Sequence, residues 1–383
     1  MLEVASMKRF RTVLIDGIDQ LLAQRSQWND LWQRSDVTIP TGRAELIAHW
    51  CRFFADQTRF VAIVVLEHDR PVLALPLVGR TISKVVSVGD LPGNEWSPAG
   101  DLMMDPDTDT RGALDALVAA LDDLPWQMLW LDGVAFENRS WSLLIDALNR
   151  SPLSVNFHEQ FRVGCMELGD DWDDYRSRWS KSHRRSMTKA TKRLADRGKV
   201  GFRLDEDIPT QRLDQRLNQA FEVEDNSWKG EAGTSILRTD SMPDFFAGQA
   251  NLLNEHGHLG LAWLTVDDQP VAFEYAMLSK GVYHSFKVSY EAAFAQASPG
   301  QLLVMHLLEH FHERADVHRF DCMGPISDSI TRWKPRTYPV GRLVIATQRP
   351  LAKALFFGYE KIWPQVRRLR TSNVDSVQVA TNC

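Results

Sequence analysis

The chain changes abruptly from strand to helix at Ser298-Pro299-Gly300-Gln301-Leu302-Leu303-Val304-Met305. Ser298 suits the N-cap of a helix, Pro299 suits the first helical position, and Gln301 completes a capping box. Gly300 lets a ligand approach the backbone closely, and the free N–H groups of such a terminus attract anions. The stretch therefore predicts either an ordinary helix start or an anion-binding site, and the sequence leaves both open.

Three antiparallel strands are predicted before this helix, over residues 261–266, 271–279 and 282–290. Their residues are apolar or alternate between apolar and polar, and turn residues separate them. After the helix, which extends to about residue 314, a further strand over 317–322 carries Asp321 near its end. The order is thus three strands, a helix and a strand that ends in an acid.

Glu274 is the acidic residue of the middle strand. Alternation places it on one face between Ala272 and Ala276. A two-residue hairpin loop after residue 279 sets Glu274 opposite Lys287. Glu274 is then either one half of a cross-strand ion pair or a partly desolvated active-site carboxylate with room for a substrate above it.

Other segments carry charge or aromatic rings in patterns that suit a site. Residues 172–197 are the most basic part of the chain and predict one long helix that includes Arg184 and Arg185. Their basic side chains either form a solvated face or bind a phosphate. The loop Ser227-Trp228-Lys229-Gly230 either walls an acceptor pocket, through Trp228 and Lys229, or uses Trp228 as a core anchor.

Taken in order, these pieces are the basic helix around His183-Arg184-Arg185, Ser227-Trp228-Lys229-Gly230, the junction at Ser298, Asp321-Cys322-Met323-Gly324 and Trp333-Lys334. Their order resembles the core of the GNAT acyltransferase superfamily. More closely, residues 172–346 resemble the Fem-type and CelD-like acyltransferases of bacterial cell-wall and exopolysaccharide biosynthesis. Residues 28–165 are similar to the N-terminal half of the same group.

The predicted fold class is α/β, with tandem GNAT-like domains that are each a mixed, mostly antiparallel sheet flanked by helices. The predicted boundaries are 1–168 for an N-terminal GNAT-like domain and 169–348 for the acyltransferase domain. Residues 349–383 are predicted as a C-terminal amphipathic helix, which packs on the domain or touches a partner or membrane, followed by a disordered tail.

The resemblance implies an N-acyltransferase that uses acyl-CoA, acetyl-CoA or a longer thioester, to acylate an amine on a small-molecule or lipid-linked amino sugar. The common GNAT pyrophosphate loop has two spaced glycines, whereas Gln296-Ala297-Ser298-Pro299-Gly300 supplies one glycine and a proline without an N–H. Some Fem-type relatives take an aminoacyl group from tRNA, which stays open as an alternative donor. A non-catalytic scaffold with the same fold, binding a partner of carbohydrate assembly or a tRNA, is a further alternative.

Composition narrows the class of protein. The 383 residues carry a net charge of −6, which argues against general DNA binding. No apolar run reaches the roughly 20 residues that span a bilayer, and charges interrupt residues 1–22, so no secretory signal is visible. A cytoplasmic location is expected, with peripheral contact to the inner membrane or the polysaccharide machinery as a lesser possibility. The four cysteines have no metal-ligand spacing, and no metal is predicted.

The predicted chemistry is direct acyl transfer, which needs a base, oxyanion donors and an acid. Glu274 is the first candidate for the base and Asp321 the second, and both are expected at an open cleft. Tyr290 and His284 are candidate acids, with His284 expected on the face opposite Lys287. The predicted donor-binding residues are Lys287, Ser298, Gly300, Gln301 and Lys334, and the predicted acceptor-binding residues are Arg184, Arg185, Trp228 and Lys229.

Overall fold

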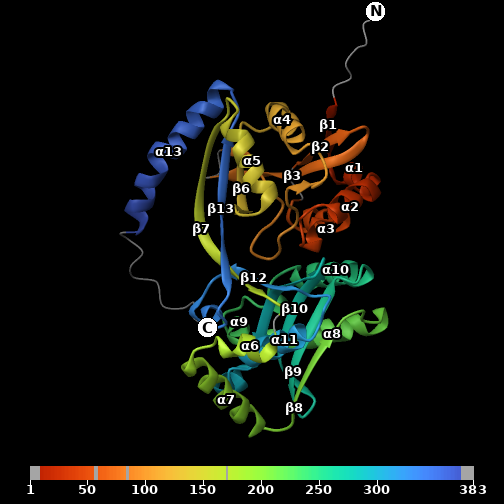
Figure 1. Ribbon diagram of the computed structural model, residues 1–383, viewed down its shortest axis with the longest axis vertical. Coiled ribbons are helices and arrows are strands. Elements are labelled where there is room, and N and C mark those ends of the chain that lie inside the picture. Colours follow the sequence, from red (N-terminus) through yellow and green to blue (C-terminus); the bar gives the residue numbers. More distant parts are fainter. Residues whose placement is uncertain (1–8, 56–58, 83–85, 170, 372–383) are drawn as a thin grey trace, which may run out of the picture. The chain divides into compact units, whose positions relative to one another are not determined.

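The computed structural model describes residues 9–55, 59–82, 86–169 and 171–371, and only the backbone of residues 361–371. The chain forms two compact units (Figure 1). Unit 1 comprises the residues up to Val37, Gly42–Gln160 and those from Pro339 on; unit 2 comprises Thr38–Thr41 and Phe161–Tyr338. These units differ from the predicted domains chiefly because the chain returns to unit 1 at Pro339.

Unit 1 is a mixed sheet in the order β1-β2-β3-β4-β6-β13. The strands are β1 (Phe10–Asp16), β2 (Phe60–Glu67), β3 (Arg70–Ile82), β4 (Val86–Asp90), β6 (Met128–Ala135) and β13 (Arg336–Ala346), and the short β5 (Met103–Met104) pairs with β3. The strands from β1 to β4 are antiparallel, β4 and β6 are parallel, and β6 and β13 are antiparallel.

Helices cover both faces of the unit 1 sheet. They are α1 (Ile18–Ala23), α2 (Arg25–Arg34), α3 (Ala44–Phe54), α4 (Thr110–Ala120), α5 (Arg139–Asn149) and α13 (Pro350–Thr371). Side chains of α4 and α5, among them Leu117 and Leu144, pack with Leu129 and Leu131 of β6 in the main core. On the other face, Phe356 of α13 packs with neighbouring strand residues (Figure 1). The predicted C-terminal amphipathic helix therefore packs on the sheet.

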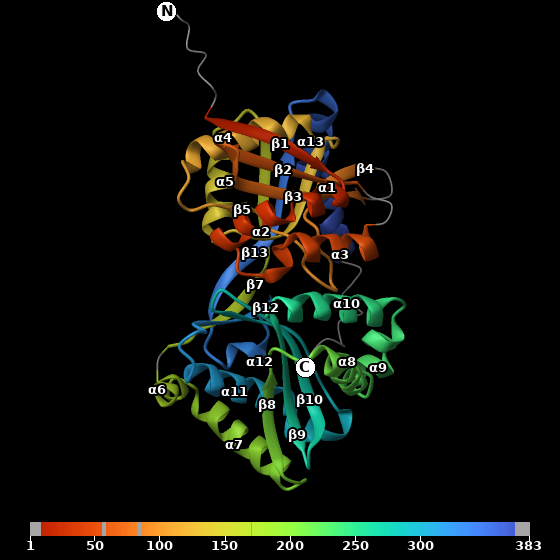
Figure 2. The same ribbon diagram turned by 90° about the vertical axis from the view of Figure 1, so that its right-hand side faces the viewer.

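Unit 2 is a mixed sheet in the order β8-β9-β10-β11-β12-β7. The strands are β7 (Ser154–Glu167), β8 (Val200–Asp205), β9 (Leu259–Val266), β10 (Gln269–Ser279), β11 (Val282–Tyr290) and β12 (Arg319–Pro325). The helices are α6 (Trp172–Ser177), α7 (Lys181–Ala195), α8 (Thr210–Asp225), α9 (Trp228–Glu231), α10 (Met242–Glu255), α11 (Pro299–His312) and α12 (Asp328–Thr331). Helices α7 and α11 lie on one face of the sheet, and α8 and α10 lie on the other (Figure 2).

The two units repeat one order of elements and exchange their last strands. Each unit has four antiparallel strands, a helix, and a strand that pairs in parallel with the fourth. The strand that follows β6 in the chain is β7, but β7 pairs with β12 of unit 2. The strand that follows β12 is β13, and β13 pairs with β6 of unit 1. The predicted tandem fold of mixed, mostly antiparallel sheets flanked by helices is confirmed.

One predicted element differs in detail. The basic segment 172–197 is not one helix, because Ser180 starts a new helix and its hydroxyl accepts a hydrogen bond from the His183 amide at 3.1 Å. Among the described residues, none of the helices has an apolar stretch that could span a lipid bilayer.

Candidate functional site

The parallel strands β11 and β12 are paired only at their beginnings. The register joins Val282 to Arg319, Tyr283 to Phe320 and His284 to Asp321. The remainder of β11, residues 285–290, has no register partner in β12. A strand without a neighbour presents N–H and C=O groups that an extended ligand can pair with. The side of this segment that faces away from β10 is called the free edge below; the name means only that β12 does not pair there, since residues of the segment have other contacts, such as the Val288 carbonyl with Lys229 at 3.2 Å.

Glu274 lies in β10 on the face that α11 covers. Its neighbours on that face, Ala272 and Ala276, belong to the core that α11 also joins. The side chain is 0% exposed, and neither carboxylate oxygen has a hydrogen-bond partner of ordinary geometry among the described residues. Burial raises the pKa of Glu274 to about 7, although the hydroxyl groups of Ser285 and Tyr283 act to lower it. A carboxylate with a pKa near neutral is suited to general-base catalysis.

A β-bulge changes the predicted neighbours of Glu274. Ala276 faces Ser285, the register of a two-residue hairpin loop, but the register then shifts, so that Tyr275 faces Lys287 and Glu274 faces Val288. The predicted pair of Glu274 and Lys287 is therefore wrong. One extra residue in β11 turns every later side chain to the other face. The bulge also places His284 and Lys287 on one face, where simple alternation predicts opposite faces.

Asp321 does not converge with Glu274, contrary to the prediction. Asp321 shares a face with its parallel partner His284, and His284 shares a face with Met277, which is on the opposite face of β10 from Glu274. The Asp321 carboxylate accepts hydrogen bonds from the Tyr338 hydroxyl and from the Met323 amide, both at 2.8 Å. Burial lowers the pKa of His284, and the negative charge of Asp321 acts in the opposite direction, to raise it. Asp321 is thus held by its own strand and by β13, and His284 is a buried group on the same side.

The free edge of β11 ends beneath the start of α11. Tyr290 packs under Gly300, where an added Cβ would lie 3.4 Å from the tyrosine ring. Arg193 of α7 donates to the carbonyl of Gln296 at 3.0 Å, and the guanidinium of Arg197 lies 4.7 Å from the centroid of the Phe294 ring. Two basic side chains therefore flank the turn that leads into α11.

The predicted cap of α11 takes another form. Ser298 is the N-cap residue, but its backbone is left-handed (φ 51°) and its side chain makes no capping hydrogen bond. Its carbonyl accepts from the amides of Gln301 and Leu302 at 3.1 and 3.2 Å. Because proline has no N–H, Gly300 is the first residue of α11 whose backbone amide can donate to a ligand. Gln301 takes part through its backbone and not through a capping box.

Three predicted site residues, Arg184, Arg185 and Lys334, lie away from the turn that leads into α11. His183 contacts Trp333, with ring centroids 4.6 Å apart, and Lys334 follows Trp333. Arg184 and Arg185 follow His183, at the far end of α7 from Arg193, which corresponds to about 13 Å along the helix axis. Arg184 donates to the carbonyl of Ser177 at 2.9 Å. The structure therefore does not bring Arg184, Arg185 and Lys334 together with Gly300.

Trp228 and Lys229 approach the free edge from the other face of the sheet. Trp228 is 48% exposed, so it is not a core anchor. The ammonium group of Lys229 donates to the Glu224 carboxylate at 2.9 Å and to the carbonyl of Val288 at 3.2 Å. Sequence reasoning missed Glu224, Ser285 and the position of Arg193. The place of Glu224 on the apolar stripe of α8 was a usable signal.

The equivalent junction of unit 1 is bridged by its own side chains. Strands β4 and β6 share one register pair, Gly89 with Leu129. Just beyond it, the Asp90 carboxylate accepts hydrogen bonds from the amides of Leu91 and Asp132 at 2.8 and 3.0 Å. Asp90 thus links β4 directly to β6. Burial raises the pKa of Asp90 to about 6.

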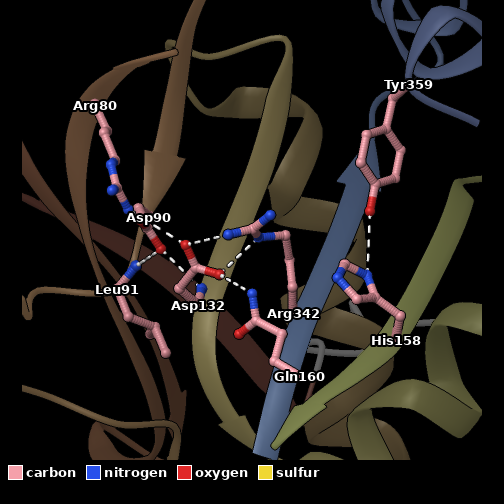
Figure 3. A network of polar contacts seen from close by, with 8 residues as sticks. All are labelled: Arg80, Asp90, Leu91, Asp132, His158, Gln160, Arg342 and Tyr359. Atoms are coloured by element: carbon pink, nitrogen blue, oxygen red, sulfur yellow. Dashed lines mark hydrogen bonds and ion pairs between the residues drawn. The ribbon is translucent and has the colours of Figure 1, made fainter. Parts of the chain in front are cut away.

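Two arginines complete this bridge (Figure 3). Arg80 donates to Asp90 at 2.7 Å, and Arg342 donates twice to Asp132, at 2.6 and 2.9 Å. Arg342 also lies 4.3 Å from the centroid of the Trp130 ring. Carboxylates and guanidinium groups therefore occupy in unit 1 the position that corresponds to the free edge in unit 2.

One family model matches part of the chain, and the matched residues all lie in unit 2. Residues 181–334 match a family model described as the acetyltransferase (GNAT) domain. The prediction of an acyltransferase is confirmed at the level of this class. The matched range contains Glu274, the free edge and α11. No curated protein matches the chain.

Solved structures resemble most of the chain in fold. The crystal structure of FemX aligns with a TM-score of 0.59 and 10% identity over 86% of this chain and 98% of that chain. The C-terminal domain of a putative lysylphosphatidylglycerol synthetase from Agrobacterium fabrum aligns with a TM-score of 0.53 and 14% identity, over 88% and 95%. A protein of unknown function from Bacteroides thetaiotaomicron aligns with a TM-score of 0.53 and 12% identity, over 89% and 100%. At these identities the similarity concerns the fold alone.

Proposed function

We propose that this protein is an N-acyltransferase whose active site lies in unit 2, beside the free edge of β11. The observation that carries the proposal is the early end of the β11–β12 pairing, with a buried carboxylate of raised pKa, Glu274, on the adjoining strand. The bridged junction of unit 1 leaves unit 2 as the catalytic unit.

The donor is proposed to be an acyl-CoA thioester. Its pantetheine amides pair with the free edge of β11, as an added strand does. Its phosphates lie at the start of α11, where the Gly300 amide, the helix dipole and the basic side chains of Arg193 and Arg197 favour negative charge. Acetyl-CoA is the simplest donor to test.

Glu274 is proposed to accept the proton of the attacking ammonium group. Because Glu274 is fully buried, the proton reaches it through the hydroxyl of Ser285, the first residue of the free edge. The freed amine then attacks the thioester carbonyl, a C–N bond forms and the C–S bond breaks. The CoA thiolate takes up a proton, and the acid that supplied it recovers a proton from the attacking nitrogen, which leaves a neutral amide. Tyr290, under the start of α11, is the proposed acid that protonates the thiolate.

The acceptor is proposed to be an amine of an amino sugar, either small or linked to a nucleotide or lipid, in bacterial exopolysaccharide or cell-envelope synthesis. Support comes from the resemblance of the ordered sequence segments to Fem-type and CelD-like enzymes. Contact with a membrane surface or with the polysaccharide machinery belongs to the same proposal.

The test is release of CoA from acetyl-CoA in the presence of a panel of amino sugars. Glu274→Gln is expected to lower kcat at least about 100-fold, the usual contribution of a general base, and Ser285→Ala to lower it less. The kcat of the wild type should rise with pH through a single ionisation near pH 7. Glu255→Gln, at an exposed position of α10, is the matched control and should leave kcat unchanged. Near-normal turnover by Glu274→Gln would remove the proposed base.

A second candidate is transfer of an aminoacyl group from tRNA. It is favoured by the single glycine and the proline at the start of α11, which supply fewer amide donors for a pyrophosphate than the common GNAT loop. The same acceptors are offered with aminoacyl-tRNA in place of acetyl-CoA. Transfer from the tRNA alone would select this donor and leave the role of Glu274 intact.

A further inference from the structure

A second group of charged side chains lies on the face of the unit 2 sheet opposite Glu274. Glu224, near the end of α8, is buried. One carboxylate oxygen accepts from Lys229 at 2.9 Å, and the other accepts from the Ile236 amide at 2.8 Å. Both oxygens of Glu224 therefore have partners within the protein.

Lys287 joins this group because of the bulge in β11. The bulge pairs it with Tyr275 and turns it toward α10, where its ammonium group lies 5.0 Å from the centroid of the Phe246 ring. Burial lowers the pKa of Lys287 to about 8, the neighbouring charge of Lys229 adds to this effect, and Glu224 opposes it. The ammonium group of Lys229 is thus bonded to Glu224, and that of Lys287 lies within electrostatic range of both. A partly buried group with excess positive charge is stabilised when an anion binds it.

The cluster of Glu224, Lys229 and Lys287 borders the proposed active site. Lys229 also donates to the carbonyl of Val288, which lies on the free edge of β11 and is 41% exposed. Asn226, just before the exposed Trp228, accepts a backbone hydrogen bond from the Ala292 amide at 3.1 Å. The turn that carries Trp228 and Lys229 is therefore attached to the segment between β11 and α11.

A glycine makes this attachment possible. A Cβ at Gly230 would lie 1.8 Å from the carbonyl oxygen of Asp225, so only glycine allows α9 to fold back so closely on the end of α8. This tight corner sets the positions of Trp228 and Lys229 relative to Glu224.

We propose that Lys229 and Lys287 bind an anionic group, a carboxylate or a phosphate, on the acyl acceptor, and that Trp228 covers the part of the acceptor next to it. The proposal rests on the proposed function and adds the class of acceptor: an amine with a negative charge near the reacting nitrogen. The acceptor approaches from the side of α8 and α9, across the sheet from α11 and the phosphates of the donor.

The test compares acceptors that differ in one charge. CoA release from acetyl-CoA is measured with glucosamine 6-phosphate against glucosamine, and with alanine against alaninamide. At least one charged member should have a kcat/KM about tenfold or more above its neutral partner, and the pair concerned distinguishes phosphate from carboxylate. Lys287→Met should remove that preference, and Lys287→Arg should restore most of it. Equal use of charged and neutral acceptors by the wild type would overturn the proposal.

Two controls address stability and charge. Lys353→Met removes the same charge from an exposed position of α13 and should keep the preference. If Lys287→Met does not fold, Trp228→Ala at an exposed position tests the same site: it should raise KM for the charged acceptor more than KM for its neutral partner. An unchanged KM in Trp228→Ala, with the preference retained in any folded Lys287 variant, would contradict the assignment.

A binding measurement separates this proposal from the proposed function. Glucosamine 6-phosphate, inorganic phosphate and acetate are titrated calorimetrically into the wild type and into Lys287→Met without any donor. Saturable binding to the wild type that weakens at least tenfold in the variant supports the anion site even if no CoA is ever released, which would overturn only the enzymatic proposal. CoA release with neutral amines and no binding of any of the three probes would overturn only the anion site.

Discussion

The buried carboxylate of Glu274 makes a quantitative prediction about stability. Its pKa is raised from an ordinary value of 4.5 to about 7. Below pH 4.5 the group is protonated in both the folded and the unfolded protein, so burial has no charge penalty there. Between pH 4.5 and 7 the unfolded protein loses the proton while the folded protein keeps it, and stability falls. Above pH 7 the folded protein bears the full free-energy cost of ionising the buried carboxylate.

The size of the effect follows from the shift. At about 1.4 kcal/mol for each pKa unit, the wild type loses about 3 kcal/mol of unfolding free energy between pH 4.5 and pH 7.5 through this group. Glu274→Gln cannot ionise, so its stability relative to the wild type should increase by the same amount over that range. For a unit of this size, 3 kcal/mol corresponds to roughly 6–12 °C in Tm. The variant is therefore expected to turn over at least about 100-fold more slowly and to gain stability relative to the wild type as the pH rises to neutral.

The assay is thermal unfolding of the wild type and Glu274→Gln at half-unit steps from pH 4.5 to pH 7.5, with Glu255→Gln as the exposed control. Other groups that titrate in this range, such as Asp90 of unit 1, are present in both proteins and cancel in the difference. A constant difference in Tm across the range would refute the reasoning, because it would mean that Glu274 does not hold a proton at pH values where an ordinary glutamate has lost it.

Three further predictions concern other parts of the chain. Arg342→Met removes two charged hydrogen bonds to Asp132 and should lower the free energy of unfolding of unit 1 by about 2 kcal/mol without changing kcat at 25 °C. A loss of kcat in the folded variant would argue that unit 1 takes part in the chemistry. Gly230→Ala, whose Cβ would overlap the carbonyl of Asp225, should cost about 1–3 kcal/mol in urea unfolding and raise KM for the acceptor; wild-type values of both would show that the α8–α9 corner is not tight. Burial raises the pKa of the Cys322 thiol well above its usual range, so the thiol is a poor nucleophile. Cys322→Ser should therefore keep at least half of the wild-type kcat, and mass spectrometry of the wild type should find no acylated cysteine. Loss of turnover in the variant, together with an acylated Cys322 in the wild type, would replace direct transfer by a covalent route.

The sequence by itself determined the features that depend on neighbouring residues. Alternation placed Glu274 between two alanines in the middle of three strands, and proline and glycine at 299 and 300 marked the start of α11. These signals are local, because strand period and helix-start chemistry involve residues a few positions apart. The order of such elements also sufficed for the tandem fold class and for the class of enzyme.

Tertiary structure decided which side chains meet. The bulge that moves Lys287 away from Glu274 depends on how β10 and β11 fit together, and neither strand shows it alone. The pairing of β13 with β6 sets Leu343 opposite Leu131. Most of unit 2 lies between these two residues in the sequence, and no local pattern encodes a partner at that distance. The early end of the β11–β12 ladder, the approach of Arg193 to Gln296, and the sharing of Glu224 between two elements follow from packing of segments far apart in the chain. The location of the free edge, and the residues gathered around it, are therefore properties of the folded molecule.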